Sequence, residues 1–301
     1  MLGFLNVYKP SGVTSHDIVK RVRKTLSIKQ IGHGGTLDPL AEGVLPIAVG
    51  PACRLLRFLA HDKVYVAEIL LGEKRDTDDI EGKVLEQCSE DFVAPSRETI
   101  EKALKLFVGE IKQRPPLYSA IHHNGKRLYE LARAGETPEI AERLVEIVAI
   151  EIIDYTYPVL KTRIFCGGGT YIRSIARDLG EQLGCFGCLK SLVRERSGPF
   201  QIEEAVSLEE HKDKLSLEQK IETPTRALAN NPNSLIVEIT PEQSRALRMG
   251  QKIVCHNLEN QEQVKCDAAT ILAVCNQEVI AICRLDAEEH IKPEVVIAHA
   301  G

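Results

Sequence analysis

A carboxylate, an imidazole and several glycines share the short segment of residues 32–46. Asp38 precedes a proline, which disfavours the helical region, so we expect Asp38 in a turn or an extended conformation. His33 lies close by, and Gly34 and Gly35 have no Cβ, so another backbone or a ligand can approach them closely. A carboxylate and an imidazole on such a loop suit catalysis in a pocket lined by backbone. The competing interpretations are a structural Asp-Pro turn and a histidine that only completes loop hydrogen bonds.

Two other segments carry residues that can do chemistry. Tyr65 follows Lys63 in a β-rich stretch. Its ring is either a half-buried strand residue or a surface on which a nucleic-acid base stacks. Arg173 follows the glycines at 167–169 and falls in the first turn of a predicted helix, where the helix dipole disfavours a cation. We therefore expect a compensating anion and propose Asp38, whose pKa an adjacent arginine would lower. The alternative is an arginine on the surface.

Basic residues mark two more segments. Lys9 begins a Lys-Pro-Ser-Gly sequence that ends a predicted strand. It either supports the loop that carries Asp38 or contacts a backbone phosphate. Basic and aromatic residues interleave over residues 114–129, which form either an ordinary surface hairpin or a surface for RNA.

Composition excludes several classes of protein. The chain has 301 residues, of which 44% are hydrophobic, and its net charge of −5 excludes a basic protein that coats nucleic acid. Positive charge still concentrates at residues 9–29 and 112–133, and this can steer a polyanion to one face. No segment has the length and apolar character of a signal peptide or a membrane helix. We expect a cytoplasmic protein that does not act at a membrane.

The sequence predicts no metal site and no cofactor. Cys185 and Cys188 are the one close pair among nine cysteines, and no second pair follows at zinc-finger spacing, so we expect reduced thiols. The acidic stretch at 75–78 lacks nearby ligands other than acids. The chain also carries no nucleotide-binding fingerprint.

Hydrophobic spacing predicts the elements that carry these residues. Strands are expected at residues 3–8, 63–72, 144–153 and 164–166, and helices from a Thr14 or Ser15 cap to Leu26, at 97–108 and at 171–183. An acidic helical region is expected at 207–223, followed by a linker at 230–233, a strand at 235–239, a helix at 241–249 and a hairpin of 270–275 with 278–285. Strands and helices neither alternate regularly nor repeat, so the pattern predicts an α+β fold with a small β-rich C-terminal part.

Four motifs resemble one known family. Residues 35–41 read Gly-Thr-Leu-Asp-Pro-Leu-Ala and residues 43–46 read Gly-Val-Leu-Pro, which is similar to the signature of the TruB family, the tRNA pseudouridine 55 synthases. Lys9-Pro-Ser-Gly, Lys63-Val-Tyr and the Gly-Thr-Tyr-Ile-Arg of residues 169–173 match further motifs in register, so the resemblance runs from about residue 5 to 197. The chain departs from the family at Gly34, where many members carry threonine, and at Gly168, where they carry lysine.

The resemblance implies a fold and a function. It implies a pseudouridine synthase domain at 1–230, with a mixed, mainly antiparallel sheet, flanking helices and a thumb loop near 112–136. A PUA-like RNA-binding domain follows at 233–301. The expected reaction is isomerisation of uridine 55 in the T-loop of tRNA, by base flipping, without cofactor or metal and in a monomer. The expected partner is the T stem-loop of tRNA.

The same resemblance assigns roles to residues. It makes Asp38 the nucleophile, Tyr65 the stacking residue and candidate base, and Arg173 the electrostatic partner of Asp38. The substrate-binding residues that it implies are His33, Lys9, Tyr171, Leu192, Gly35 and Thr36. Two other functions stay open at this point: a non-catalytic protein that binds or folds tRNA, and a metabolic enzyme that uses residues 32–35 as a phosphate nest.

Overall fold

The computed structural model of the chain describes residues 1–119, 121–123, 125–229, 231, 234–254, 270–286 and 290–297. The chain divides into two compact units, Met1–His61 with Arg196–Gly301 and Asp62–Glu195. Three residues of the predicted linker, Asn230, Pro232 and Asn233, lie outside the described part, so the predicted boundary between 1–230 and 233–301 stays a prediction. None of the helices in the described part combines the length and the apolar character that a membrane crossing requires.

Strands β1 (Gly3–Lys9) and β3 (Glu42–Val49) position the loop that carries Asp38. They pair antiparallel with Lys9 opposite Gly43, so the turn after β1 and the loop before β3 lie at the same end of the pair. Strand β2 (Ile31–His33) pairs antiparallel with the last residues of β3, and the 3₁₀ helix η1 (Gly50–Phe58) follows β3. Residues 34–41 are therefore the loop between two strands that pair with each other.

Helix α1 (Ser15–Leu26) confirms the predicted cap and apolar face. The Thr14 hydroxyl accepts the Asp17 N–H and the Asp17 carboxylate accepts the Thr14 N–H, which is a capping box. The apolar residues at four-residue spacing lie on one side of the helix and are buried: Ile18, Val22 and Leu26. They pack in one cluster with residues of β1 and β3.

A four-stranded sheet forms the C-terminal part in the order β14 (Ser234–Glu238), β15 (Thr270–Cys275), β16 (Glu278–Leu285), β17 (Ile291–Val296). The predicted hairpin is confirmed as β15 and β16, joined through Asn276 and Gln277 at φ of 51° and 66°. Positive φ at both central residues is typical of a two-residue hairpin loop. Strand β14 pairs parallel with β15, which makes this sheet mixed.

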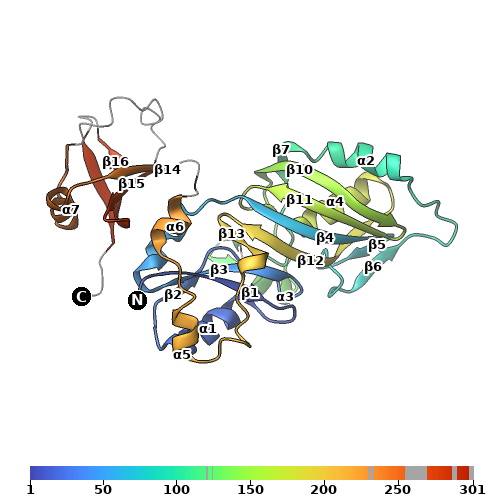
Figure 1. Cartoon of the computed structure of the whole chain (residues 1–301). Helices are drawn as coiled ribbons and strands as arrows, with labels where there is room; N and C mark the ends of the chain where they lie inside the picture. The colour runs from blue at the N-terminus through green and yellow to red at the C-terminus, as the bar shows by residue number, and fades with distance from the viewer. Residues whose placement is uncertain are drawn as a thin grey trace. The chain divides into compact units, whose positions relative to one another are not determined.

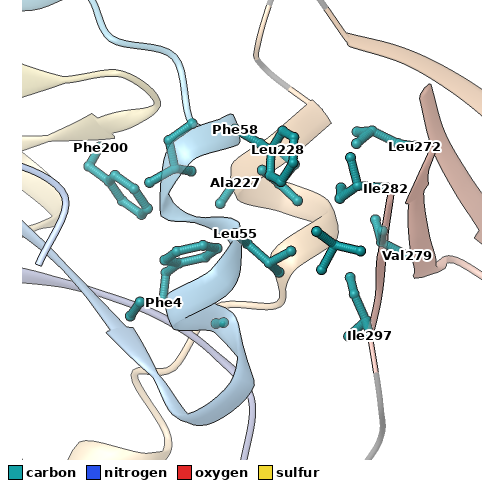
Figure 2. Packing of buried hydrophobic residues seen from close by; sticks show 14 of the residues in the cluster. Phe4, Leu55, Phe58, Phe200, Ala227, Leu228, Leu272, Val279, Ile282 and Ile297 are labelled. Atoms are coloured by element: carbon teal, nitrogen blue, oxygen red, sulfur yellow. The ribbon is translucent and has the colours of Figure 1, made fainter. Parts of the chain in front are cut away.

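Alternating residues of this sheet face two different apolar clusters, as the two-residue period of a strand requires. Ile271 and Ala273 pack in the cluster that contains Leu247 of α7 (Pro241–Arg248). Leu272 packs in the other cluster, and Figure 2 shows it with Leu55 and Phe58 of η1, Leu228 of α6 (Pro224–Ala229) and Ile282.

The prediction of one helical region at 207–223 is wrong. The helix there is confined to α5 (Lys214–Glu218). It follows β13 (Phe200–Gln201), which pairs with the end of β12 (Gly187–Ser197), and the short 3₁₀ helix η2 (Ile202–Glu204). The Asp213 carboxylate accepts the Ser216 N–H at 2.9 Å, so Asp213 caps a new helix and the preceding residues cannot continue through it.

The second unit contains an antiparallel sheet in the order β4 (Lys63–Leu71), β11 (Val159–Cys166), β10 (Arg143–Thr156), β7 (Gly109–Gln113). Strand β12 (Gly187–Ser197) lies beside β4. Helix α2 (Arg97–Lys105) contacts β10, α4 (Ile172–Gln182) contacts β4, and the two helices contact each other, so they cover one face of this sheet (Figure 1). The predicted α+β class and the mainly antiparallel pairing are confirmed.

Short elements complete the second unit. Strands β5 (Glu73–Arg75) and β6 (Val84–Gln87) bracket the acidic loop. The predicted thumb contains β8 (His122–His123), β9 (Lys126–Arg127) and α3 (Leu128–Arg133), while Ala120 and Asn124 lie outside the described residues.

Candidate active site

Asp38 lies half-buried on a loop whose backbone is held on both sides of it. Before Asp38, the Ser15 hydroxyl accepts the Leu37 N–H at 2.8 Å and donates to the Leu37 carbonyl at 3.1 Å. After Asp38, the Gly12 N–H donates to the Pro39 carbonyl at 2.8 Å. The carboxylate is therefore presented from a loop that the turn after β1 and the start of α1 hold in one conformation.

Lys9 is fully buried, and its ammonium group lies among carbonyl oxygens of the same loop. It donates to Ala41 at 2.6 Å, to Pro10 at 2.9 Å and to Pro39 at 3.3 Å. A buried charge requires such partners, because burying it without them is very costly. Of the two roles expected for Lys9, these contacts favour support of the loop over contact with a phosphate.

Local geometry explains the two glycines between His33 and Asp38. Gly35 has a φ of 146°, a conformation that favours glycine. A Cβ on Gly34 would lie 3.2 Å from Pro46 Cβ and 3.5 Å from Leu56 Cδ2, so a larger residue there needs its neighbours to shift. The Gly34 N–H donates to the Pro46 carbonyl at 2.8 Å. A group used in this way cannot hold a phosphate, which argues against the nest interpretation of this loop.

Tyr65 and Leu192 lie on the adjacent strands β4 and β12 of the second unit. Each is 6% exposed. On the same strand as Tyr65, burial lowers the pKa of Lys63, and repulsion from the Arg194 guanidinium lowers it further. Burial in this part of the sheet therefore disfavours the charged form of Lys63.

Arg173 is buried in the first turn of α4 and binds three groups of its own unit. Its Nη1 donates to the Thr77 carbonyl at 3.0 Å, and its Nη2 donates to the Tyr118 carbonyl at 2.9 Å. The Asp79 carboxylate lies 3.5 Å from Nη1, and both side chains are 5% exposed. Asp79 thus supplies an anion of the kind that the helix-dipole argument requires. The predicted pairing of Arg173 with Asp38 joins the two units and stays a prediction.

The acidic loop also holds α4, a role that the sequence did not predict. The Asp79 carboxylate also accepts the Thr77 hydroxyl at 2.6 Å, and Arg177, one turn after Arg173, pairs with Asp78 at 2.8 Å. Burial raises the pKa of Asp78, and the charge of Arg177 opposes that rise. Arg173 and Arg177 are four residues apart on a helix and therefore share one face. The two adjacent acids of the loop, Asp78 and Asp79, were the signal in the sequence that such a pair of arginines has partners.

The structure distributes the predicted site residues over the two units. The first unit carries Asp38 and Lys9 with His33 at the end of β2, Gly35, and Thr36, whose side chain is exposed. The second unit carries Tyr65, Leu192 and Arg173 with Tyr171, the residue that precedes α4. Within the described part of the chain, no three His, Cys, Asp or Glu side chains are grouped as metal ligands.

Comparisons with known proteins agree with these observations. The family model for the N-terminal domain of TruB family pseudouridylate synthases matches residues 23–172, and the model for the C-terminal domain of tRNA pseudouridylate synthase B matches residues 173–230. The tRNA pseudouridine synthase B of Gloeothece citriformis is 46% identical over 265 residues, which cover 85% of this chain and 83% of that protein. The protein of the same name from Gloeobacter violaceus is 52% identical over 212 residues, which cover 69% of this chain and 72% of that protein.

Solved structures extend the similarity to the C-terminal sheet. A chain of a Cbf5-Nop10-Gar1 complex aligns with a TM-score of 0.70 at 25% identity and covers 98% of this chain and 84% of its own length. A chain of an H/ACA RNP bound to a substrate RNA containing 2′-deoxyuridine aligns with a TM-score of 0.70 at 22% identity, over 99% of this chain and 85% of its own length.

Proposed function

The chain belongs to the TruB family of pseudouridylate synthases, and from this premise we propose that it isomerises uridine 55 in the T-loop of tRNA to pseudouridine. Membership of the family makes it an isomerase that modifies tRNA. The position of the uridine and the mechanism are the proposal. The observation that carries it is Asp38, a half-buried carboxylate on a loop that Ser15, Gly12 and Lys9 hold before and after it.

The reaction is balanced without any co-reactant. The bond between N1 and C1′ of the uridine breaks, a bond between C5 and C1′ forms, C5 loses a proton and N1 gains one. Asp38 acts as the nucleophile that attaches and leaves again, at C1′ or at C6. A carboxylate on a fixed loop suits this task, because correct placement removes much of the entropic cost of the attack.

The other predicted residues act on the flipped base. Tyr65, a buried ring, stacks on the uracil and is the candidate base for the C5 proton, while Leu192 forms an apolar wall. Stacking is worth about 1–3 kcal/mol per base, which offsets part of the cost of unstacking. Arg173 is the electrostatic partner of Asp38 in this proposal, and His33 assists extrusion of the uridine and then contacts it. Tyr171, Gly35 and Thr36 complete the pocket.

Two regions bind the rest of the RNA in this proposal. The thumb at 112–136 closes over the T-loop, where unpaired bases can be stacked and read. The C-terminal β domain acts as a PUA-like module on the same tRNA. The fold of this domain recurs in a chain of a solved H/ACA RNP, which aligns over 99% of this chain.

Tritium release from tRNA transcripts made with 5-tritiated uridine tests the proposal. We expect the wild-type protein to release one tritium per transcript and to release none when uridine 55 is replaced by cytidine. Release from the substituted transcript at the wild-type rate would place the modified uridine elsewhere. Tight binding of both transcripts without release from either would favour the alternative, a non-catalytic protein that binds or folds tRNA.

A further inference from the structure

The end of strand β7 is tied to the start of helix α4 by a buried glutamine. Gln113 is 1% exposed. Its Oε1 accepts the Tyr171 N–H at 2.8 Å, and its Nε2 donates to the Tyr171 carbonyl at 3.1 Å. One side chain therefore satisfies both backbone groups of Tyr171, which lies two residues before Arg173, and it fixes the direction in which α4 begins.

Side chains of α4 in turn hold the backbone that follows Gln113. The Arg114 carbonyl accepts two hydrogen bonds, from the Ser174 hydroxyl at 2.8 Å and from Nη2 of Arg177 at 2.8 Å. The Tyr118 carbonyl accepts Nη2 of Arg173 at 2.9 Å. Residues 113–118 are the incoming arm of the predicted thumb. Three side chains from the first two turns of α4 therefore hold this arm by its carbonyl oxygens.

The guanidinium of Arg177 is held in one orientation by its ion pairs and hydrogen bonds. Arg177 is 8% exposed, yet its Nη1 lies 2.8 Å from Asp78 and its Nε lies 2.8 Å from Asp178. The third nitrogen of the guanidinium is the one that binds the Arg114 carbonyl. Because all three nitrogens of this planar guanidinium are bonded, it tolerates little movement. A lysine at the same position could not form the same set of bonds.

We infer that Gln113, Ser174 and Arg177 are positioning residues that lock the incoming arm of the thumb to the catalytic helix and thereby fix the orientation of Arg173. This inference rests on the catalytic role proposed for Arg173. The three residues act through Tyr171 and Arg114 and do not touch the RNA. Their loss lowers the rate of the chemical step and leaves the affinity for tRNA nearly unchanged.

Single-turnover kinetics with a separate binding measurement test the inference. The substrate is bulk tRNA labelled with 5-tritiated uridine, so that turnover is detected at whichever uridine is modified. Gln113→Met keeps the length of the side chain and removes both bonds to Tyr171. We expect its maximal rate constant to fall by about 10-fold or more, while its Kd for tRNA, measured by filter binding, changes by less than about 3-fold. Gln182→Met, an exposed glutamine at the end of α4, is the matched control and should behave as wild type.

A second variant keeps the test valid if Gln113→Met does not fold. Arg177→Lys retains the charge opposite Asp78 and gives up the bond to the Arg114 carbonyl, and we expect the same fall in rate without loss of affinity. A wild-type rate constant in either folded variant, or a loss confined to Kd, would overturn the inference. Tritium release by the wild type from the transcript that lacks uridine 55, or by Asp38→Asn, would instead contradict the proposed function. The ratio of variant to wild-type rates still decides the positioning role in that case.

Discussion

Replacing Lys9 by methionine separates its two predicted roles. The methionine keeps most of the volume of the buried side chain, so the packing around β1 is retained, but the three hydrogen bonds to Ala41, Pro10 and Pro39 are lost. The Pro39 carbonyl keeps the Gly12 N–H as a donor at 2.8 Å. The bond to the Ala41 carbonyl, at 2.6 Å, is buried, whereas the other two are partly buried, so we expect its removal to have the largest effect.

The expected loss of stability can be estimated from the Ala41 carbonyl. A buried acceptor that loses its donor costs about 1–3 kcal/mol. We therefore expect Lys9→Met to lower the free energy of unfolding by about 2 kcal/mol, measured by urea denaturation. Because the lost bonds flank Asp38, we also expect the maximal rate of tritium release to fall by about 10-fold or more. The Kd for tRNA and its dependence on salt should stay as in the wild type.

The opposite pattern would refute this reasoning. If Lys9 contacted a phosphate, Lys9→Met would weaken tRNA binding and reduce the slope of log K against log salt by about 1, with unchanged stability. Lys20→Met is the control. Its side chain is 62% exposed and lies 3.3 Å from Asp17, and an exposed pair of this kind contributes little.

Three further predictions concern the described part of the chain. Gly180→Ala places a Cβ 2.1 Å from the Phe186 carbonyl carbon and 2.2 Å from the Gly187 nitrogen, backbone atoms that cannot move aside, so it should lower the melting temperature severely. Gly167→Ala, whose nearest neighbour lies at 3.6 Å, should have little effect. Burial lowers the pKa of Lys63, so the unfolded chain binds that proton more tightly, and stability from this residue rises with pH toward 10.5. Between the lowered pKa and 10.5, urea denaturation should therefore show that the free energy of unfolding of the wild type, relative to that of Lys63→Met, increases with pH. Burial raises the pKa of Cys166, Cys185 and Cys188 to about 11, so mass spectrometry after brief alkylation of the native protein at pH 8 should find them unmodified. Labelling of these three at the rate of a free thiol would contradict the burial on which the prediction depends.

Local signals explain the parts of the fold that the sequence predicted. The Thr14 cap depends on Asp17 three residues later, and the turn of the C-terminal hairpin depends on Asn276, a residue type that tolerates positive φ. The prediction for residues 207–223 was wrong for a local reason too. Its acidic and apolar pattern predicts one helix, whereas Asp213 acts as a cap inside it.

The contacts of the candidate site could not be predicted in the same way. The position of Arg173 in the first turn of a helix correctly indicated that it needs an anion. Asp79 and the carbonyls of Thr77 and Tyr118 are its partners in the structure, and the last two lie 96 and 55 residues away in the sequence. Such partners are set by which loops the sheet brings to α4, and spacing along the chain carries no information about that. Gln113 was missed for the same reason, because a glutamine at the end of a strand gives no local signal.

The central claim is that the carboxylate of Asp38 attacks the uridine of a bound tRNA. Asp38→Asn keeps the size of the side chain and its place on the loop and removes only its nucleophilic charge. Single-turnover tritium release and filter binding should be measured on the same preparation of labelled tRNA. We expect wild-type affinity for tRNA with no tritium release above background. Release by Asp38→Asn within about 10-fold of the wild-type rate would contradict it.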